Sequence, residues 1–503
     1  MPRPALLGLD LGTTAVKAGL FEVESGQAVG LAWREYRANS PHPGWAELPA
    51  ETYWRAAVEA VREAQATAGR PPVLGLGLCS QGQTFLLLDA ERRPLRPAVI
   101  WLDTRGQKQT ERLNELLQGP DGHRRPGGVT LNVVNSAPKL LWLRENEPRV
   151  WAATRYVTLL PDYFVLRLTG ERRLDVSNAA STGMLDRQNG RWWPEALEAV
   201  GTPREWLSDL GRPGDLAGYL QAAPAQELGL PVGLPVALGC NDQLSGAVGV
   251  ANLQPGIASG TVGTALALIG TVVEPGEAGR LGLLSGPHAV PGLWFLLSYA
   301  KTCGIVLTWL RDLSAPGAAY EELLTEAAQV PPGADGLVCL PHFSGTATPA
   351  FRAEVRGAFL GLKLSHQRGH LVRAVAEAAG FGACDALELM SRAGTRPREL
   401  RMLGGATRSA WWMQLLADML GLPLRVPACG EAPVLGAALF GGLGAGTFAS
   451  LQEAAARFYR VQDEYEPCSK ETTRYADHYL AYRSVMERLY PGALGSHLSP
   501  GGG

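Results

Sequence analysis

The first 21 residues contain two apolar runs separated by a short polar turn. ALLGLDL precedes Gly-Thr-Thr, and AVKAGLF follows it. Apolar runs of this length on both sides of a glycine-containing turn predict two β-strands joined as a hairpin. Residues 257–273, IASGTVGTALALIGTVV, repeat the design, with Gly260 and Thr261 as the expected turn. The repeat predicts two halves of similar architecture.

Between and after these hairpins, helical and strand patterns alternate. Helical patterns occupy residues 52–66, 370–394 and 409–421, and apolar strand-like runs occupy residues 73–82 and 399–405. Strands that alternate with helices of this length are typical of an α/β fold built on central sheets.

The length of the chain predicts more than one domain. At 503 residues it is too long for a single hydrophobic core, so two large domains are expected. The segment ANLQPG (251–256) is the best boundary, which predicts domains at 1–250 and 256–490. Residues 491–503 end in a run rich in Gly, Ser and Pro and are expected to form a disordered tail.

Composition and charge exclude several classes of protein. With 46% hydrophobic and 19% charged residues and a net charge of −2, the chain is typical of a soluble enzyme and unlike a nucleic-acid or membrane-surface binder. The seven cysteines are scattered, which predicts reduced thiols in a cytoplasmic protein. Residues 243–273 lack charge, but Asn252, Gln254 and Pro255 interrupt them, so buried strands are expected rather than a membrane span.

Asp10 ends the first apolar strand, directly before the Gly-Thr-Thr turn. A carboxylate there costs burial energy unless it meets a cation or hydrogen-bond donors. Thr13 and Thr14 offer backbone N–H groups and hydroxyls of the kind that hold phosphate oxygens. One interpretation therefore places Asp10 toward Mg²⁺ and Thr13 toward phosphate; the other makes Asp10 the cap of its own turn.

A second glycine-rich turn lies between the strand at 399–405 and the helix at 409–421. Paired glycines at 404–405 allow a flat ligand to lie on bare backbone, and a helix N-terminus favours oxyanions. The alternative is close packing of the strand on the helix. The chain contains no GxxxxGK[ST] or GxGxxG motif, so a P-loop or Rossmann nucleotide site is not expected.

Asp242 follows the apolar strand LPVALG (234–239) and precedes a small-residue helix. Open α/β sheets present reactive groups at the carboxyl ends of their strands. Such a carboxylate can accept the proton of an alcohol during phosphoryl transfer. The alternative is that it serves as the N-cap of the following helix, and both roles can hold at once.

Taken in order, these segments resemble the FGGY family of carbohydrate kinases, which includes xylulokinase and glycerol kinase. The resemblance covers roughly residues 5–490. Its motifs are GLDLGTTAVK, NDQLSGAVG, GGATRSAWWMQLLAD and, at 139–143, KLLWL followed by Glu145 and Asn146. It implies two actin-like, RNase H-type domains with an ATP-binding cleft between them, and it favours a homodimer.

The resemblance also implies roles for individual residues. Asp242 becomes the general base, and Asp10 becomes the carboxylate associated with Mg²⁺. Thr13 and Lys17 match positions that contact the nucleotide phosphates. Further positions that match phosphate or adenosine contacts are Gly260, Thr261, Gly304, Gly405 and Ser409, where Ser409 replaces the Asn of glycerol kinases.

The sugar site departs from the family pattern. Gly82 and Gln83 fill the variable positions of the substrate loop, which reads Gln-Met-His in xylulokinases and Gln-Arg-Glu in glycerol kinases. Gly82 supplies no guanidinium for a polyol, which disfavours glycerol. Trp101 and Asp103 match the WxD element of that pocket. Gln243 is similar to glycerol kinase, whereas the surrounding segments are closer to xylulokinase.

These features predict an ATP-dependent kinase that phosphorylates a hydroxyl of a small ketose or polyol. ATP and Mg²⁺ are the expected cofactors, and neither nucleic acid nor a membrane is an expected partner. Two alternatives remain at this point. One is an actin- or chaperone-like ATPase that phosphorylates no sugar, and the other is a catalytically inactive sugar-binding relative.

Overall fold

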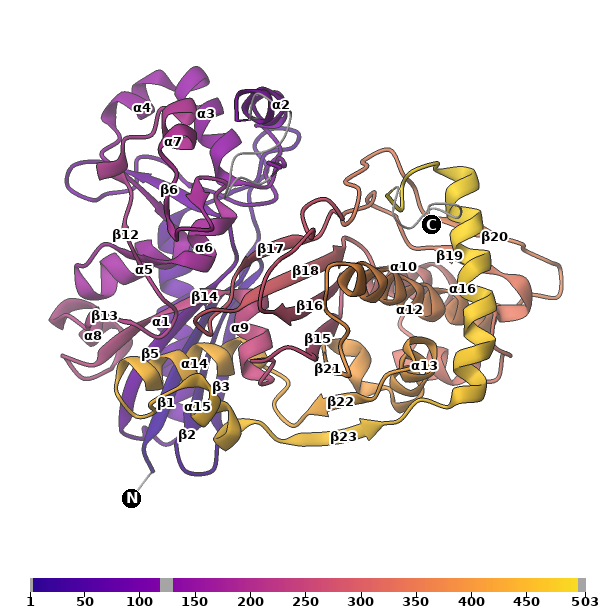
Figure 1. Cartoon of the computed structure of the whole chain (residues 1–503). Helices are drawn as coiled ribbons and strands as arrows, with labels where there is room; N and C mark the ends of the chain where they lie inside the picture. Colours follow the sequence, from indigo (N-terminus) through magenta and orange to yellow (C-terminus); the bar gives the residue numbers. More distant parts are fainter. Residues whose placement is uncertain (1–2, 118–129, 496–503) are drawn as a thin grey trace. The chain divides into compact units, whose positions relative to one another are not determined.

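The computed structural model describes residues 3–117 and 130–495, so most of the expected tail at 491–503 lies outside the described residues. The predicted α/β class, with one central sheet in each half, is confirmed (Figure 1). Contacts divide the chain into two compact units. The first contains Met1–Ala251, Gly286–Pro291 and Glu431–Tyr459, and the second contains Asn252–Ser285, Gly292–Gly430 and Arg460–Gly503. The chain therefore returns to the first unit near its end, which a single boundary at 251–256 does not describe.

A mixed six-stranded sheet forms the centre of the first unit, in the order β13-β14-β5-β1-β2-β3. β1 and β2 are the predicted antiparallel hairpin. β5 is parallel to β1 and β14 is parallel to β5, and the register aligns Leu11, Ser80 and Asn241 in one row at the carboxyl edge. The loops that follow these three residues therefore share one edge of the sheet. The strands are β1 Ala5–Leu11, β2 Ala15–Glu22, β3 Ala28–Glu35, β5 Val73–Ser80, β13 Leu216–Tyr219 and β14 Pro235–Asn241.

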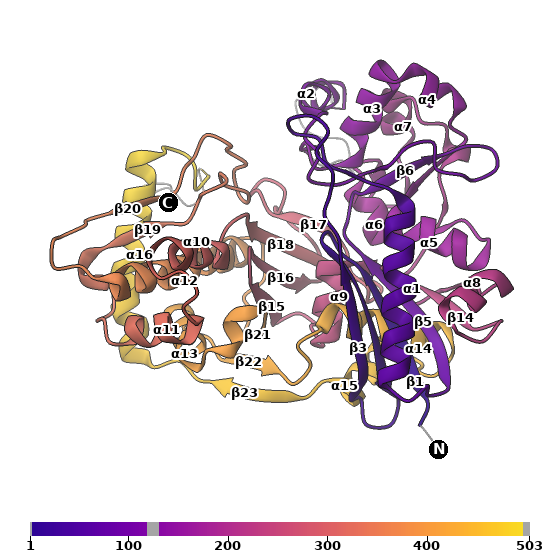
Figure 2. The ribbon, with the colours of Figure 1, turned by 180° about the vertical axis from the view of Figure 1, so that it is seen from behind.

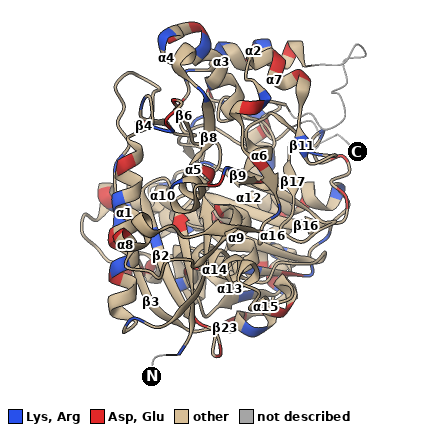
Figure 3. Ribbon diagram, turned by 90° about the vertical axis from the view of Figure 1, so that its left-hand side faces the viewer, with Lys and Arg blue, Asp and Glu red and all other residues tan. Residues whose placement is uncertain are grey.

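Helices cover both faces of this sheet. α1 (Ala50–Thr67) and α5 (Leu160–Thr169) pack on one face, and α14 (Ala432–Gly444) packs on the other (Figures 1 and 2). α14 lies on bare strand backbone, because a Cβ at Gly77 would stand 1.8 Å from the Ala437 carbonyl oxygen. The backbone contact explains why the segment after Glu431 belongs to the first unit. On the outer side of α1, basic and acidic residues lie side by side (Figure 3), and Arg34 of β3 pairs with Glu59 and Glu63.

The first unit also contains a smaller sheet and several short elements. A four-stranded sheet, β4-β7-β6-β8, contains β6, the strand that directly follows the expected substrate loop. Its strands are β4 Glu47–Leu48, β6 Phe85–Leu88, β7 Ala98–Val99 and β8 Tyr156–Leu159. The remaining elements are α2 Gln107–Leu116, α3 Ser136–Asn146, α4 Pro148–Ala153, β9 Arg173–Asp175, α6 Val176–Ser181, β10 Leu185–Asp186, β11 Arg191–Trp192, α7 Pro194–Val200, β12 Asp209–Gly211, α8 Ala222–Leu228, α9 Asp242–Gly249 and α15 Leu451–Phe458.

A seven-stranded sheet forms the centre of the second unit, in the order β17-β18-β16-β15-β21-β22-β23. β15 and β16 form the second predicted hairpin. The sequence-based prediction of its turn, at Gly260 and Thr261, is wrong. Gly260 and Thr261 lie within β15, paired with Leu268 and Ala267, and the chain turns at residues 263–265. The strands are β15 Ile257–Val262, β16 Leu266–Val272, β17 Leu284–Pro287, β18 Trp294–Ala300, β21 Glu399–Leu403, β22 Leu424–Pro427 and β23 Val461–Tyr465.

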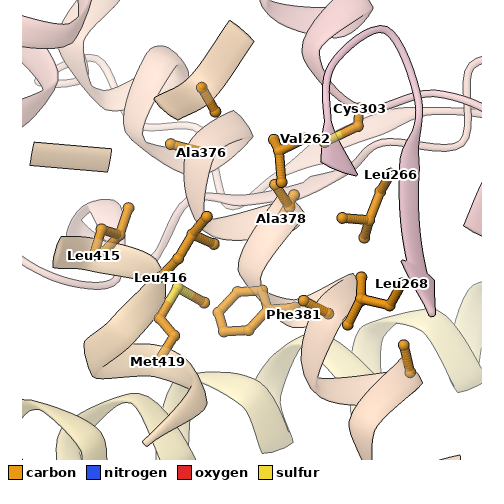
Figure 4. Packing of buried hydrophobic residues seen from close by; sticks show 14 of the residues in the cluster. Val262, Leu266, Leu268, Cys303, Ala376, Ala378, Phe381, Leu415, Leu416 and Met419 are labelled. Atoms are coloured by element: carbon orange, nitrogen blue, oxygen red, sulfur yellow. The ribbon is translucent and has the colours of Figure 1, made fainter. Parts of the chain in front are cut away.

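The core of the second unit lies between this sheet and its helices. Phe381 of the long helix α12 (Arg368–Arg392) lies among Leu268 of β16 and Leu416 and Met419 of α13 (Ala410–Leu420) (Figure 4). The other elements of the unit are α10 Gly304–Ser314, α11 Tyr320–Ala328, β19 Val338–Leu340, β20 Ala358–Leu360 and α16 Ser469–Leu489. The expected helices at 370–394 and 409–421 are thus confirmed.

The uncharged stretch 243–273 forms α9, β15 and β16 rather than one long apolar helix. Within residues 3–117 and 130–495, none of the helices combines the length and the apolar character that crossing a bilayer requires.

Candidate active site

The Gly-Thr-Thr turn joins β1 to β2 at the carboxyl edge of the first sheet. The Gly12 carbonyl oxygen accepts hydrogen bonds from the Tyr36 hydroxyl at 2.5 Å and from Gln81 Nε2 at 3.1 Å. The N–H groups of Thr13 and Thr14 have no acceptor among the described residues. Hydrogen bonds to the Gly12 carbonyl oxygen hold this turn in place, while these two N–H groups have no acceptor in the described part of the chain. Such a turn is suited to bind oxyanions. Sequence reasoning assigned neither Tyr36 nor Gln81 to this turn, since neither belongs to the Gly-Thr-Thr motif.

Asp10 lies one residue before the end of β1, with 7% of its surface exposed. Its Oδ1 is buried and has no hydrogen-bond partner among the described residues. Burial raises the pKa of this carboxyl from 3.8 to about 6, and the charge of nearby Lys17 opposes the rise. The interpretation of Asp10 as the cap of its own turn receives no support, because no hydrogen bond joins it to that turn. An unpaired carboxylate oxygen at this edge is suited to accept a cation.

Asp242 is the first residue of α9 and is half-buried. The N-cap is Asn241, whose Oδ1 accepts from the Gln243 N–H at 3.0 Å. Asp242 Oδ1 also accepts from this N–H group at 2.8 Å, and the Gln243 side chain is half-buried. Burial and the negative charge of Asp10 raise the pKa of Asp242 to about 7. The capping role is thus filled by the neighbouring residue, and Asp242 has a proton affinity suited to a general base.

Lys17 stands opposite Asp10 in the β1–β2 ladder. Its Nζ forms an ion pair with Glu431 Oε2 at 2.6 Å, and both side chains are 39% exposed. A cation that is partly open to solvent beside the phosphate-type turn can also meet an anionic ligand. Glu431 was not expected from the sequence, because 414 residues separate the two partners.

The expected substrate loop, residues 80–84, follows β5 and has an unusual backbone. Gln83 adopts a φ of 61°, its N–H donates to Ser181 Oγ at 3.2 Å, and its carbonyl oxygen accepts from Ser136 Oγ at 2.8 Å. Gly82 is buried and Gln83 is half-buried. Two anchored peptide groups hold a strained residue in place, so the Gln83 side chain leaves the loop in a fixed direction.

Trp101 links this region to the Gly-Thr-Thr turn, since its indole Nε1 donates to Thr13 Oγ1 at 2.9 Å. Its carbonyl oxygen accepts from Lys139 Nζ at 3.1 Å. The KLLWL motif therefore supplies a buried lysine that holds the WxD segment. Burial lowers the pKa of this lysine to about 7.

Asp103 is fully buried and is engaged within the protein. Its Oδ1 accepts from the N–H and Nε of Arg105, and its Oδ2 accepts from Arg105 and from the Ala46 N–H at 2.7 Å. The Arg105 guanidinium lies 3.7 Å over the Trp45 ring. These contacts favour a role for Asp103 in holding the loop around Trp101, and its direct contact with a sugar stays a prediction.

In the second unit, the turn at residues 263–265 is the counterpart of the N-terminal turn. Gly263 N–H donates to the Ala265 carbonyl at 3.0 Å, as Gly12 N–H does to Ala15. Gly304 begins α10, its N–H donates to the Gly263 carbonyl at 2.7 Å, and a Cβ there would stand 2.4 Å from that oxygen. The structure thus brings Gly304 to the turn and places Gly260 three residues and Thr261 two residues before it. The second Gly-Thr pair, at 263–264, was the signal that could have located the turn.

The two glycines at 404–405 have different surroundings. Gly404 has a φ of 92°, and a Cβ there would lie 2.5 Å from the Val262 carbonyl oxygen, so this glycine serves close packing. A Cβ at Gly405 would meet nothing within 4 Å, so open space lies before it. Ser409 is the N-cap of α13, and its hydroxyl accepts from the Trp412 N–H at 3.2 Å. Packing and an open surface therefore coexist in one turn.

Comparisons with known proteins agree with this arrangement. The N-terminal domain of the FGGY family of carbohydrate kinases matches residues 5–249, and the C-terminal domain of that family matches residues 257–445. The xylulose kinase of Lactococcus lactis is 30% identical over 492 residues, which is 96% of each chain. The autoinducer-2 kinase of Yersinia enterocolitica is 30% identical, over 92% of this chain and 90% of its own. The crystal structure of xylulose kinase from Rhodospirillum rubrum has a TM-score of 0.87 at 30% identity, over 97% of this chain and 99% of its own. The chain therefore belongs to the FGGY family of carbohydrate kinases, ATP-using phosphotransferases whose acceptor is an alcohol group.

Proposed function

We propose that this kinase transfers the γ-phosphoryl group of ATP to a hydroxyl of a small ketose or polyol, with xylulose as the first candidate. The observation that carries the proposal is Asp242, a half-buried carboxylate at the start of α9 that does not occupy the N-cap position and whose pKa is raised to about 7. Similarity to xylulose kinases supports xylulose, whereas equal similarity to an autoinducer-2 kinase keeps the acceptor open to test.

The chemistry required of the protein is mainly positioning and charge neutralisation. A sugar hydroxyl is barely acidic, and the transferred group passes through a loose, metaphosphate-like state. Asp242 would orient the acceptor hydroxyl and take its proton late in the transfer. The hydrogen bond to the Gln243 N–H holds the Asp242 carboxylate in one orientation.

Asp10 fits the expected Mg²⁺ ion as one ligand among several. Its buried Oδ1 has no partner among the described residues. The part of the chain that the structure describes holds no group of three or more His, Cys, Asp or Glu side chains placed around a metal. Mg²⁺ commonly takes one or two carboxylates and completes its shell with phosphate oxygens and water. When bound, it would neutralise charge on the ATP phosphates.

The remaining contacts divide between two groups of residues. The N–H groups of Thr13 and Thr14 and the Lys17 ammonium would bind nucleotide phosphates, and Lys17 would exchange part of its ion pair with Glu431 for them. In the second unit, the 263–265 turn would bind phosphate with Gly304 behind it. The open surface before Gly405 is suited to a flat group such as adenosine, beside Ser409.

An ADP-release assay across a panel of ketoses and polyols tests the proposal. The assay is run with and without each sugar, and the products are checked for sugar phosphate. ADP release that depends on one sugar supports the kinase. ADP release independent of sugar would support the alternative of an ATPase, and absence of any sugar phosphate would support the inactive relative.

A further inference from the structure

Position 82 of the substrate loop has no side chain, and the Asn241 carboxamide fills the space in front of it. A Cβ built on Gly82 would stand 2.8 Å from Asn241 Nδ2 and 3.4 Å from Ser181 Oγ. The backbone of Gly82 does not have a positive φ, so its conformation does not explain the glycine. A larger residue at position 82 would have to displace the Asn241 carboxamide.

The orientation of the Asn241 carboxamide is fixed by hydrogen bonds. Its Oδ1 caps α9 by accepting from the Gln243 N–H at 3.0 Å, and its own backbone N–H donates to Ser177 Oγ at 3.1 Å. A backbone N–H can only donate, so the oxygen of the carboxamide must face the helix. The amide nitrogen therefore faces position 82. The hydrogen bond to the helix thus decides which atom of the carboxamide is oxygen and which is nitrogen.

Asn241 Nδ2 has two N–H donors and no acceptor among the described residues. The side chain is half-buried, so a ligand can reach it. Asn241 precedes Asp242 directly, and its strand position is aligned with Ser80 at the start of the substrate loop. An oriented donor beside the proposed base is placed to bind an oxygen atom of the ligand.

We propose that Asn241 is a specificity-determining residue. Its Nδ2 donates a hydrogen bond to an oxygen of the acceptor sugar, next to the hydroxyl whose proton Asp242 accepts. The inference rests on the proposed function and narrows the substrate class. The acceptor carries a second oxygen, as hydroxyl or carbonyl, adjacent to the phosphorylated position. In this account Gly82 is small so that Asn241 can reach the sugar.

The test compares D-xylulose and its monodeoxy analogues as substrates for wild-type enzyme and Asn241→Ser. Serine keeps the N-cap of α9 and removes the amide donor. We expect kcat/KM for D-xylulose to fall on the order of 10- to 100-fold, with KM for ATP unchanged. The wild-type preference for D-xylulose over one deoxy analogue should also disappear in the variant. An unchanged preference for every analogue would overturn the inference.

Gly82→Ala provides a second variant that leaves Asn241 in the sequence but displaces its carboxamide. It should lower kcat/KM for D-xylulose, and in the double variant with Asn241→Ser the two effects should not add. Additive effects would show that the two residues do not share one space and would overturn the inference. Gly279→Ala is the matched control, because a Cβ there meets nothing within 4 Å. If the wild-type chain phosphorylates no sugar of the panel, the proposed function itself fails, which is a separate outcome.

Discussion

The indole Nε1 of Trp101 donates a hydrogen bond to the hydroxyl Oγ1 of Thr13 at 2.9 Å. Trp101 belongs to the segment expected at the sugar, and Thr13 to the turn expected at the nucleotide phosphates. The two segments are 88 residues apart in the sequence and meet through one side-chain contact. The contact fixes the Thr13 hydroxyl and leaves the N–H groups of the turn free for a ligand.

We predict that Trp101→Phe, which keeps an aromatic ring and removes the donor, lowers kcat/KM for the sugar by roughly 10-fold. The effect of Thr13→Val should not add to that of Trp101→Phe, because the two variants remove the same hydrogen bond. Steady-state kinetics of the two single variants and the double variant measure this. Trp33→Phe is the control, since that ring is 58% exposed on β3. Fully additive losses would contradict the coupling.

The pH dependence of the rate should follow the pair of carboxyl groups. The pKa of Asp242 is raised to about 7 and that of Asp10 to about 6, and each must be ionised to act as base or cation ligand. We therefore expect kcat/KM for the sugar to rise with pH and to level off above about pH 7. Rates measured between pH 5.5 and 8.5 in one buffer mixture test this. A flat profile over that range would exclude a base with this pKa.

Asp242 should reduce the stability of the folded chain at alkaline pH. Its pKa in the folded chain, about 7, lies above the ordinary value of 3.8. The stability contributed by the protonated carboxyl is therefore full below pH 3.8 and is lost as pH rises through 7. At pH 8, the free energy of unfolding of Asp242→Asn should exceed that of the wild type by on the order of 1–4 kcal/mol. The difference should be smaller at pH 5.5. Thermal unfolding at both values measures it, and equal midpoints at pH 8 would contradict the burial of this charge.

Lys139 should position Trp101 through the backbone. The lysine is fully buried, and its Nζ donates to the Trp101 carbonyl at 3.1 Å and to the Val134 carbonyl at 2.8 Å. Lys139→Met fills the space but leaves both carbonyl oxygens without their donor. We expect a loss of about 1–3 kcal/mol of stability and a raised KM for the sugar, with KM for ATP unchanged. Denaturant unfolding and substrate kinetics check the two effects, and loss of stability with an unchanged sugar KM would limit Lys139 to a structural role.

Local patterns predicted the elements on which the proposed catalytic residues lie. The strand that ends near Asp10, the turn after it and the helix that begins at Asp242 all follow from short runs of sequence, because strand and helix periodicities are local properties. The second hairpin was also expected, yet two Gly-Thr pairs stand three residues apart in it. Either pair could form the turn, and only the pairing of β15 with β16 decides for residues 263–265.

Long-range contacts could not be read from the sequence. α14 is apolar on nearly all sides, so its pattern gave no indication of which sheet it packs on, and Gly8 and Gly77 reveal the contact only in the structure. The ion pair of Lys17 with Glu431 depends on that packing. The capping role of Asn241 depends on its rotamer, which a sequence motif does not specify. Contacts of this kind arise from tertiary structure rather than from local propensity.

The central claim is that Asp242 receives the proton of the sugar hydroxyl, and direct mass measurement of the sugar phosphate tests it. Wild-type chain and Asp242→Asn are incubated with ATP, Mg²⁺ and the preferred sugar of the panel. The amount of sugar phosphate is measured by mass at successive times. We predict sugar phosphate from the wild type and a kcat lowered on the order of 10²- to 10⁴-fold in the variant, with unchanged nucleotide affinity. Turnover of Asp242→Asn close to that of the wild type would contradict the account.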